Sequence, residues 1–376
     1  MIAMFAPKYD VDTCMEEIRE CLEKGWTGQG FKTLEFEEQW KNYTGLPNAH
    51  FLCTATAGLN LAVQILKEQN GWGDNDEIIS TPITFVATNN AILTNNMKVI
   101  FADVDKTLCL DPADVEKKIT KNTKAVIFVG LGGNIGHYYK IVEICKKYNL
   151  KLILDAAHMA GTRVNGIIPG SEADVVVYSF HVTKNLSTAD GGMLCFKNQH
   201  YDEIARKLSW NGIDKTSSPA KYEKHYKWKQ NITHVADAYN GNSIMAAIAI
   251  AQLSHLDEEN KYRRRVVQWY VDEFEGFEGI EPVEVPENCD SSRWIYQIMV
   301  RDRDGLMQYL QDQEIGCALH YLDNTEYPMY KEQNGICRYA TYVSEHVISL
   351  PLHLGITHED VKVVAGAVKD YVDKNR

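Results

Sequence analysis

The amino-acid sequence predicts an α/β fold built around a largely parallel sheet. Short apolar segments alternate with helical patterns through the first two thirds of the chain, and turn residues bound each segment. Most of these segments are continuous apolar runs, which is typical of strands covered by helices on both faces. Strands that are separated by helices favour parallel pairing, because each parallel neighbour needs a long crossover connection.

Seven segments in this part of the chain have the length and apolar content of strands. They are residues 49–53, 77–80, 98–102, 125–129, 152–155, 175–180 and 193–196. Helical patterns lie between them, for example at residues 59–67 and 139–148.

The pattern changes after Ala246. A long helical pattern at residues 244–274 precedes one strand segment, 294–300, and helices near 306–313 and 359–375. This indicates a smaller α+β domain that is attached by a long helix. We therefore expect a large domain at residues 1–245 and a small C-terminal domain at 246–376.

The composition is that of a soluble globular protein, with 376 residues, 45% hydrophobic and 24% charged. The net charge of −12 disfavours nucleic-acid binding, and we interpret Arg263, Arg264 and Arg265 as a solvated helix face. No apolar run approaches the roughly 20 residues that span a bilayer, and the N-terminus does not resemble a signal peptide. We expect a cytoplasmic protein without a membrane segment.

Nine cysteines are scattered along the chain, and none of them forms a CxxC pair. An odd number without regular spacing predicts neither a disulfide framework nor a zinc site. This usage fits the reducing cytoplasm, and we expect no metal.

The segment from Thr54 to Gly58 follows a predicted strand and opens a predicted helix. Free N–H groups and the helix dipole favour an anion there, and the Thr56 hydroxyl adds a donor. This turn is a candidate phosphate site. Small residues at such a turn are equally compatible with packing or helix capping.

Asp155 ends an apolar run and is followed by His158. A carboxylate at the C-terminal end of a buried strand lies at the edge where open α/β sheets bind ligands. The alternative is a helix cap or a buried ion pair. His158 on its own is better explained as a packing histidine.

Lys184 lies 29 residues after Asp155, between an apolar strand and the pair Gly191 and Gly192. A lysine that forms an imine needs surroundings that favour its uncharged state, and a nearby aspartate can hold a pyridinium nitrogen protonated. The two glycines allow a chain reversal and a close approach to a flat ligand. A surface-loop lysine is the alternative. The simplest single ligand that needs both Lys184 and Asp155 is pyridoxal 5′-phosphate (PLP).

These segments, in this order, resemble the DegT/DnrJ/StrS family of PLP-dependent sugar aminotransferases, which have the aspartate aminotransferase fold (fold type I). The resemblance runs from Gly25 to Pro351. The segments that carry it are residues 54–59, 84–88, 155–158, 179–185, 191–192, 246–248, 252–253, 320–321 and 349–353. It implies a large PLP-binding domain with a mostly parallel mixed sheet and a smaller α+β domain.

The resemblance also implies roles for single residues. Lys184 would form the imine with the cofactor, and Asp155 would pair with the pyridine nitrogen. Phe85 would stack on the ring, and His158 would lie near the 3-hydroxyl group of the ring.

The cofactor's phosphate would be bound by Thr56, Ala57 and Ser179. In the family, an asparagine of the partner subunit also reaches this phosphate. Asn240 is our candidate, and Asn242 is the alternative, because the local spacing is two residues shorter than the common pattern. We therefore expect a homodimer with shared active sites.

Two segments depart from the family pattern. Residues 130–137 replace the usual His-x-x-Gly-Gln, and residues 187–190 replace Thr-Thr-Gly-Glu. Because both lie near the expected pocket, these departures concern the substrate more than the cofactor. We expect Asn134, His320 and Tyr321 to contact the substrate.

The resemblance implies an aminotransferase that acts on a nucleotide-linked keto sugar with glutamate as the donor. The retained Lys184 disfavours the dehydratase branch, which has histidine there. The motif at residues 179–185 is more similar to members that aminate C-4 than to members that aminate C-3. The alternatives are an aminotransferase of a cyclitol or another non-nucleotide ketone, and a PLP-binding regulator without catalysis.

Overall fold

The computed structural model describes residues 1–214 and 231–375. Its centre is a seven-stranded sheet in the order β1-β8-β7-β5-β4-β2-β3. These strands are β1 (His50–Leu52), β2 (Glu77–Ser80), β3 (Lys98–Phe101), β4 (Thr123–Val129), β5 (Lys151–Asp155), β7 (Val175–Ser179) and β8 (Gly192–Phe196). The run from β3 to β7 is parallel, and β8 is antiparallel to both of its neighbours. The predicted sheet is confirmed, and the bounds of its strands differ from the prediction by two residues at most.

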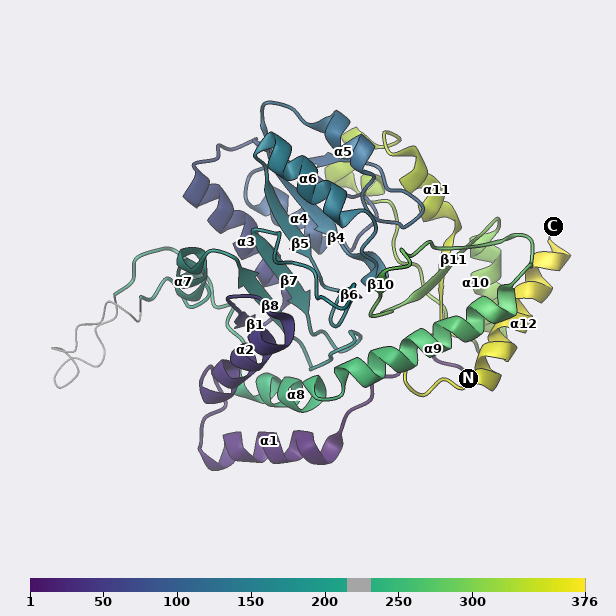
Figure 1. The fold of residues 1–376 in the computed structure, drawn as a ribbon, viewed down its shortest axis with the longest axis horizontal. Coiled ribbons are helices and arrows are strands. Elements are labelled where there is room, and N and C mark those ends of the chain that lie inside the picture. The colour runs from purple at the N-terminus through teal and green to yellow at the C-terminus, as the bar shows by residue number, and fades with distance from the viewer. Residues whose placement is uncertain (215–230, 376) are drawn as a thin grey trace.

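Helices cover both faces of this sheet (Figure 1). They include α2 (Phe31–Thr44), α3 (Ala55–Asn70), α4 (Ala87–Thr94), α5 (Pro112–Lys118), α6 (Tyr138–Tyr148) and α7 (Gln199–Leu208). Helix α1 (Val11–Glu23) lies farther out, against α8 (Ser243–Leu253). Val126 and Phe128 of β4 join an apolar core with side chains of α2 and α6, whereas Ala125 and Ile127 join a second core with side chains of α3 and α4. Burial on both faces explains why the strand is a continuous apolar run.

The C-terminal third contains an antiparallel sheet in the order β12-β11-β9. Its elements are β9 (Ile280–Pro282), β11 (Tyr296–Val300), β12 (Val347–Leu350), α9 (Leu256–Phe274), α10 (Arg303–Asp312) and α12 (His358–Lys374). They share a third apolar core. The remaining elements are β6 (Arg163–Val164), β10 (Cys289–Asp290), α8 (Ser243–Leu253), α11 (Arg338–His346) and the short 3-10 helices η1 (Leu131–Gly133), η3 (Asn324–Glu326) and η4 (Pro328–Gln333).

The prediction of a single long helix at residues 244–274 is wrong. The structure has two helices there, α8 and α9, which are separated at Ser254 and His255. Ala246 and Ala249 of α8 belong to the core of the large sheet, whereas Val266 of α9 belongs to the small core. We therefore propose that the boundary between the domains lies at the junction of α8 and α9, and not at residue 246.

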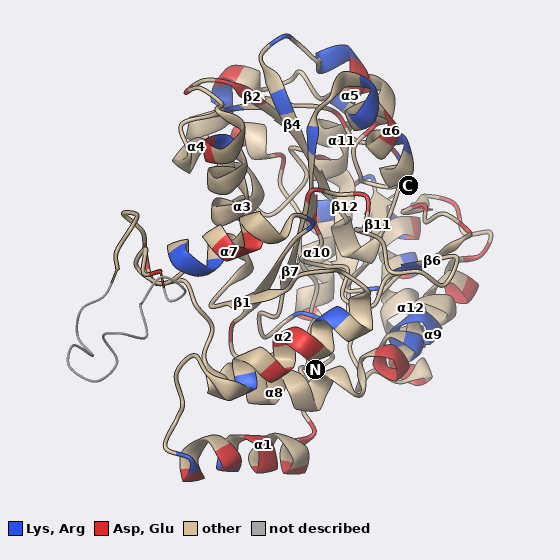
Figure 2. Ribbon diagram, turned by 60° about the vertical axis from the view of Figure 1, so that its left-hand side comes forward, with Lys and Arg blue, Asp and Glu red and all other residues tan. Residues whose placement is uncertain are grey.

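The interpretation of the arginine triplet also needs a correction. Arg263 is buried, and its Nη1 donates to Asn260 Oδ1 at 3.1 Å. Arg264 is partly buried, and Arg265 is the one exposed residue of the triplet. Figure 2 shows charges of both signs side by side on α9. Among the helices within residues 1–214 and 231–375, none is long and apolar enough to cross a membrane.

Candidate active site

A cavity of about 430 Å³ opens at the carboxyl edge of the large sheet. Val129, Asp155 and Ser179 are the last residues of β4, β5 and β7, and all three line it. The small domain contributes Trp294, His320 and Tyr321 to the opposite wall, and the N-terminal segment contributes Phe5. The position agrees with the rule that open α/β sheets bind ligands outside the carboxyl ends of their strands.

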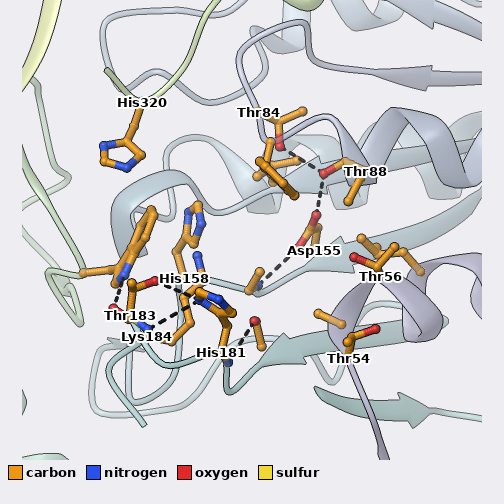
Figure 3. A pocket seen from close by; sticks show the side chains of 18 of the residues that line it. Thr54, Thr56, Thr84, Thr88, Asp155, His158, His181, Thr183, Lys184 and His320 are labelled. Carbon is orange, nitrogen blue, oxygen red and sulfur yellow. Dashed lines mark hydrogen bonds between the residues drawn. The ribbon is translucent and has the colours of Figure 1, made fainter. Parts of the chain in front are cut away.

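The first turn of α3 forms one end of the cavity (Figure 3). Thr54 is the N-cap, and its Oγ1 accepts a hydrogen bond from Ala57 N at 3.1 Å. The N–H groups of Ala55 and Thr56 precede the first intrahelical hydrogen bond, so they have no partner within the helix. Thr54, Ala55, Thr56 and Ser179 all line the cavity. This end is suited to an anion.

Ala57 does not take the position that was expected of it. It is buried, it is absent from the cavity lining, and its N–H group is used by the cap. Besides Thr56, the residue at the cavity whose N–H group has no partner within the helix is Ala55, which the motif contains but to which no role was assigned. We therefore replace Ala57 by Ala55 in the proposed site.

Gly192 brings β8 against the start of α3. A Cβ atom at this position would lie 2.5 Å from Ala55 N and 2.6 Å from Thr54 C. A side chain here would push the first turn of α3 away from the sheet. The glycine pair was expected to let the backbone approach a flat ligand. Gly192 instead lets β8 approach the backbone of Thr54 and Ala55, and this contact shapes the anion-binding end of the cavity.

Asp155 lines the cavity and is 3% exposed. Its Oδ2 accepts from Thr88 Oγ1 at 2.7 Å, and its Oδ1 accepts from Ala157 N at 3.1 Å. Thr88 is in turn 3.0 Å from Thr84 Oγ1. Burial raises the pKa of Asp155, whereas these two hydrogen bonds and the charge of Lys184 lower it. The carboxylate is thus held in place but is short of compensating positive charge.

Lys184 lies in the loop between β7 and β8, where its backbone N donates to His181 O at 2.8 Å. Burial lowers the pKa of its amine to about 7, and the attraction of Asp155 opposes this shift. The Nζ atom lies over the ring of Trp294, 3.5 Å from the centroid. A large fraction of this amine is therefore uncharged near neutral pH, as attack on a carbonyl carbon requires.

His158 lies close to Lys184 (Figure 3). Its Nδ1 accepts a hydrogen bond from Gly132 N at 3.3 Å, so the proton of the neutral ring is on Nε2. Burial, together with the nearby Lys184 and His320, holds the pKa of His158 well below its usual value. The side chain is therefore a neutral hydrogen-bond donor in the cavity.

The open side of the cavity is aromatic. Phe85 is 56% exposed, and its ring lies 6.0 Å from that of Tyr321. His320 Nδ1 is 2.9 Å from Ser349 Oγ, and burial lowers the pKa of His320 to about 4. A half-exposed ring beside a polar cavity is placed to cover a flat ligand.

Asn134 is not part of the cavity. Its Nδ2 donates to Thr107 O at 3.0 Å and to Glu284 O at 2.7 Å, and its Oδ1 accepts from Gly136 N at 3.0 Å. These bonds use the whole side-chain amide to join two loops. We therefore leave Asn134 out of the proposed site, contrary to our expectation.

The two candidate asparagines differ in their contacts. Asn242 is the N-cap of α8, and its Oδ1 accepts from Met245 N at 2.9 Å. The side chain of Asn240 makes a weaker contact, from Nδ2 to Gly241 O at 3.3 Å. Neither side chain lines the cavity of its own chain. Asn240 therefore remains the better candidate for a contact with a partner subunit.

Several residues that line the cavity had been assigned no role from the sequence. Among them are Phe5, Thr88 and Trp294. Thr88 lies in the segment 84–88, and its Oγ1 is 3.0 Å from Thr84 Oγ1, so the two threonines of that segment were the available signal. Phe5 and Trp294 reach the cavity only through the packing of the small domain, and their surroundings in the sequence contain no such signal.

The fold and this cavity define a PLP-dependent transferase of fold type I. The chain belongs to the DegT/DnrJ/EryC1/StrS aminotransferase family, whose model matches residues 9–369. The chain is thus an aminotransferase, and its cofactor is PLP.

Relatives match over nearly their whole length. The spore coat polysaccharide biosynthesis protein SpsC of Bacillus subtilis is 30% identical, with 95% of this chain and 94% of SpsC covered. The UDP-4-amino-4,6-dideoxy-N-acetyl-beta-L-altrosamine transaminase of Campylobacter jejuni is 29% identical, with 97% and 95% covered. The solved PMP-form of Spr1654 from Streptococcus pneumoniae is 27% identical and has a TM-score of 0.90, with 98% and 99% covered.

Proposed function

We propose that this protein transfers an amino group from glutamate to C-4 of a nucleotide-linked 4-keto sugar. The observation that carries the proposal is the meeting of Lys184 and Asp155 in one buried cavity of a chain that belongs to an aminotransferase family. The name of the Campylobacter jejuni relative supports a nucleotide sugar and amination at C-4. The motif at residues 179–185 supports C-4 as well, and glutamate rests on the family resemblance.

The residues of the cavity fit PLP. Asp155 is a buried carboxylate that is short of positive charge, and a protonated ring nitrogen beside it would offset the cost of its burial. The first turn of α3 would bind the phosphate through the N–H groups of Ala55 and Thr56. Ser179, at the end of β7, would add a hydroxyl donor at the same end.

The flat ring would lie between these two ends. Phe85 would cover one side of it, and the Nε2–H group of His158 would donate to the oxygen of the ring hydroxyl. When bound, PLP supplies an electron sink for the carbon that loses a proton and a carrier for the amino group. Asp155 would hold the proton on the ring nitrogen, and Thr88 would hold Asp155 in the orientation that this requires.

Lys184 would move the protons of the reaction. Because the pKa of its amine is about 7, Nζ can remove a proton from the α-carbon of the donor and also return one at neutral pH. With the acceptor bound, Nζ would deliver a proton to the former carbonyl carbon of the sugar. His320 and Tyr321, on the wall of the small domain, would contact the acceptor.

A panel of ketones tests the proposed substrate. The purified enzyme would be incubated with ¹⁵N-glutamate and with UDP- and dTDP-linked 4-keto sugars, 3-keto sugars and an unmodified keto cyclitol. Mass spectrometry should find ¹⁵N in the 4-amino nucleotide sugars, and the Lys184→Ala variant should incorporate none. Incorporation only into the cyclitol, or into 3-amino sugars, would replace the proposed substrate. PLP binding without transfer to any ketone would favour the regulator.

We further propose a homodimer whose active sites are shared through Asn240. Large apolar side chains are exposed on α1 and α2, among them Val11 at 65%, Leu22 at 62% and Leu34 at 61%. Such a surface is typical of an interface between subunits. A two-fold interface would bring the same loop to the partner's phosphate end on both sides.

Complementation tests this arrangement. A Lys184→Ala chain would be mixed with an Asn240→Ala chain under conditions that exchange subunits. If the sites are shared, the heterodimer collects both defects in one site and leaves the other site intact, so activity rises above that of either parent. A mixture that exchanges subunits and stays as inactive as its parents excludes sharing through Asn240. Asn242→Ala, which removes only the helix cap, serves as the matched control.

A further inference from the structure

Trp294 reaches from the small domain into the cavity and is 4% exposed. It precedes β11, and its backbone N donates to Gly132 O at 3.2 Å. Its indole Nε1 donates to Thr183 O at 2.7 Å. The indole is therefore tied at its backbone to one loop of the large domain and at its ring nitrogen to another.

The residue two positions earlier fixes the same loop. Ser292 Oγ donates to His158 O at 2.7 Å, and Ser292 O accepts from Asn185 Nδ2 at 2.6 Å. Asn185 follows Lys184 directly in the chain. The loop that carries Trp294 is thus bonded to His158 and to Asn185, the residue next to Lys184. The plane of the indole therefore has little freedom to move.

Two titratable side chains lie against this plane. The ring of His158 stacks on it with centroids 3.8 Å apart and an angle of 20° between the planes. The Nζ atom of Lys184 lies 3.5 Å from the ring centroid, within the range of a cation–π contact. No other described aromatic ring is recorded in such a contact with Lys184.

We propose that Trp294 is a positioning residue, whose indole face holds the free amine of Lys184 and stabilises its protonated form. The proposal rests on the proposed function, in which Lys184 has to leave the cofactor in order to move protons. A carboxylate partner would hold the amine through a directed hydrogen bond. A π face attracts the cation without a fixed acceptor atom, so the amine is retained in the cavity but stays free to turn.

The charges around the amine explain why such a contact matters. The titratable groups that act on Lys184 are Asp155 from β5, His158 after it and His320 from the small domain. Both histidines are held neutral by burial, so Asp155 alone opposes the effect of burial on the amine. The negative face of the indole acts in the same direction as Asp155. Its removal should lower the proton affinity of the amine further.

The test uses the protein without cofactor, so that it does not depend on turnover. Lysines are methylated reductively with ¹³C-formaldehyde, and the signal of Lys184 is assigned by its absence in Lys184→Arg. In the wild type, this signal should be shifted upfield by the ring current of Trp294, and it should titrate near pH 7. In Trp294→Leu, the upfield shift should vanish, and the midpoint should fall by about 0.5–1.5 pH units.

Two further variants keep the result decisive. Trp294→Phe retains a ring but loses the bond to Thr183, so part of the upfield shift should remain in this variant. It replaces Trp294→Leu in the test if that variant does not fold. Trp269→Leu, which removes a tryptophan of α9 that stacks on His358, should leave the Lys184 signal unchanged. An ordinary shift of Lys184 in the wild type, or an unchanged shift and midpoint in a folded Trp294→Leu, overturns the proposal. A failure of the ketone panel would leave this measurement unaffected, so the two proposals are tested separately.

Discussion

The two walls of the cavity are built in different ways. The wall of the large domain consists of residues at the ends of parallel strands, such as Asp155 and Ser179, and of the first turn of α3. The wall of the small domain consists of Trp294, His320 and Tyr321, which come from two separate segments and reach the cavity through domain packing. The first wall presents an anion site and a buried carboxylate, and the second presents aromatic rings.

This difference separates two tasks. In our proposal, the groups that a PLP reaction needs for every substrate lie at the sheet edge and in the loop after β7. His320 and Tyr321, which would contact the acceptor, lie on the wall of the small domain, and Trp294 of the same wall holds Lys184. We therefore expect variants of the first wall to reduce all reactions alike, and variants of His320 or Tyr321 to act on one substrate more than on the other.

The largest effect is expected from Lys184→Ala. Turnover should fall by at least about 10⁴-fold, because the variant lacks both the nucleophile and the proton carrier. PLP should still bind through the contacts at the phosphate and at Asp155, as equilibrium dialysis would show. In the wild type, borohydride should fix the cofactor to Lys184, whereas Lys197→Ala should behave as the wild type. A label on another lysine would remove the basis of the comparison.

The second-largest loss of turnover is expected from Asp155→Asn. An amide can accept the hydrogen bond from Thr88, but it cannot stabilise a protonated ring nitrogen. We expect the turnover number to fall by at least roughly 10²-fold, which equals about 2.7 kcal/mol of barrier, with a much smaller loss of PLP affinity. Asp174→Asn is the matched control, because Asp174 accepts from Leu152 N at 2.9 Å at the other end of β5. Near-normal turnover of Asp155→Asn would assign Asp155 to structure.

The pH dependence of cofactor capture should show the lowered pKa of Lys184. Burial makes the uncharged amine predominate above pH 7, so the rate of covalent PLP capture should level off between pH 7 and 8. Below pH 7, protonation should slow capture by about tenfold per pH unit, as expected for a single titrating group. Stopped-flow absorbance with the cofactor-free protein measures the rate, and free Nα-acetyl-lysine is the control. A rate that keeps rising towards pH 10 would show that Lys184 has the pKa of an ordinary lysine.

The sequence predicted the wall of the large domain far better than the wall of the small domain. Asp155 could be placed because it ends a continuous apolar run, and open α/β sheets bind ligands at the carboxyl ends of such strands. Ser179 was placed by the family resemblance. We replaced Ala57 by Ala55 in the proposed site, because the N–H group of Ala57 donates to the Thr54 side chain that caps α3. That competition is decided by backbone geometry within one turn.

Trp294 and Asn134 illustrate what the sequence did not contain. Trp294 enters the cavity because the loop before β11 is bonded to the loops that carry Gly132 and Thr183, which are more than a hundred residues away in the chain. Asn134 lies in a segment that departs from the family pattern, yet its amide is used by Thr107 and Glu284. Both outcomes depend on contacts between distant segments, and local patterns do not record such contacts.

The smallest effect is expected from His320→Asn, and it tests the comparison most directly. His320 belongs to the wall of the small domain, so its loss should weaken a contact with the acceptor and leave the donor reaction unchanged. One hydrogen bond of about 1 kcal/mol corresponds to a loss of about fivefold in kcat/KM for the keto sugar. Single-turnover absorbance with glutamate alone should match the wild type. Ser349→Ala, which removes only the partner of His320 Nδ1, should have a smaller effect on the same parameter. The opposite outcome is that His320→Asn slows the reaction with glutamate as much as the reaction with the sugar. In that case the two walls do not divide the tasks as inferred, and His320 acts through the charge of Lys184, which lies in the same cavity.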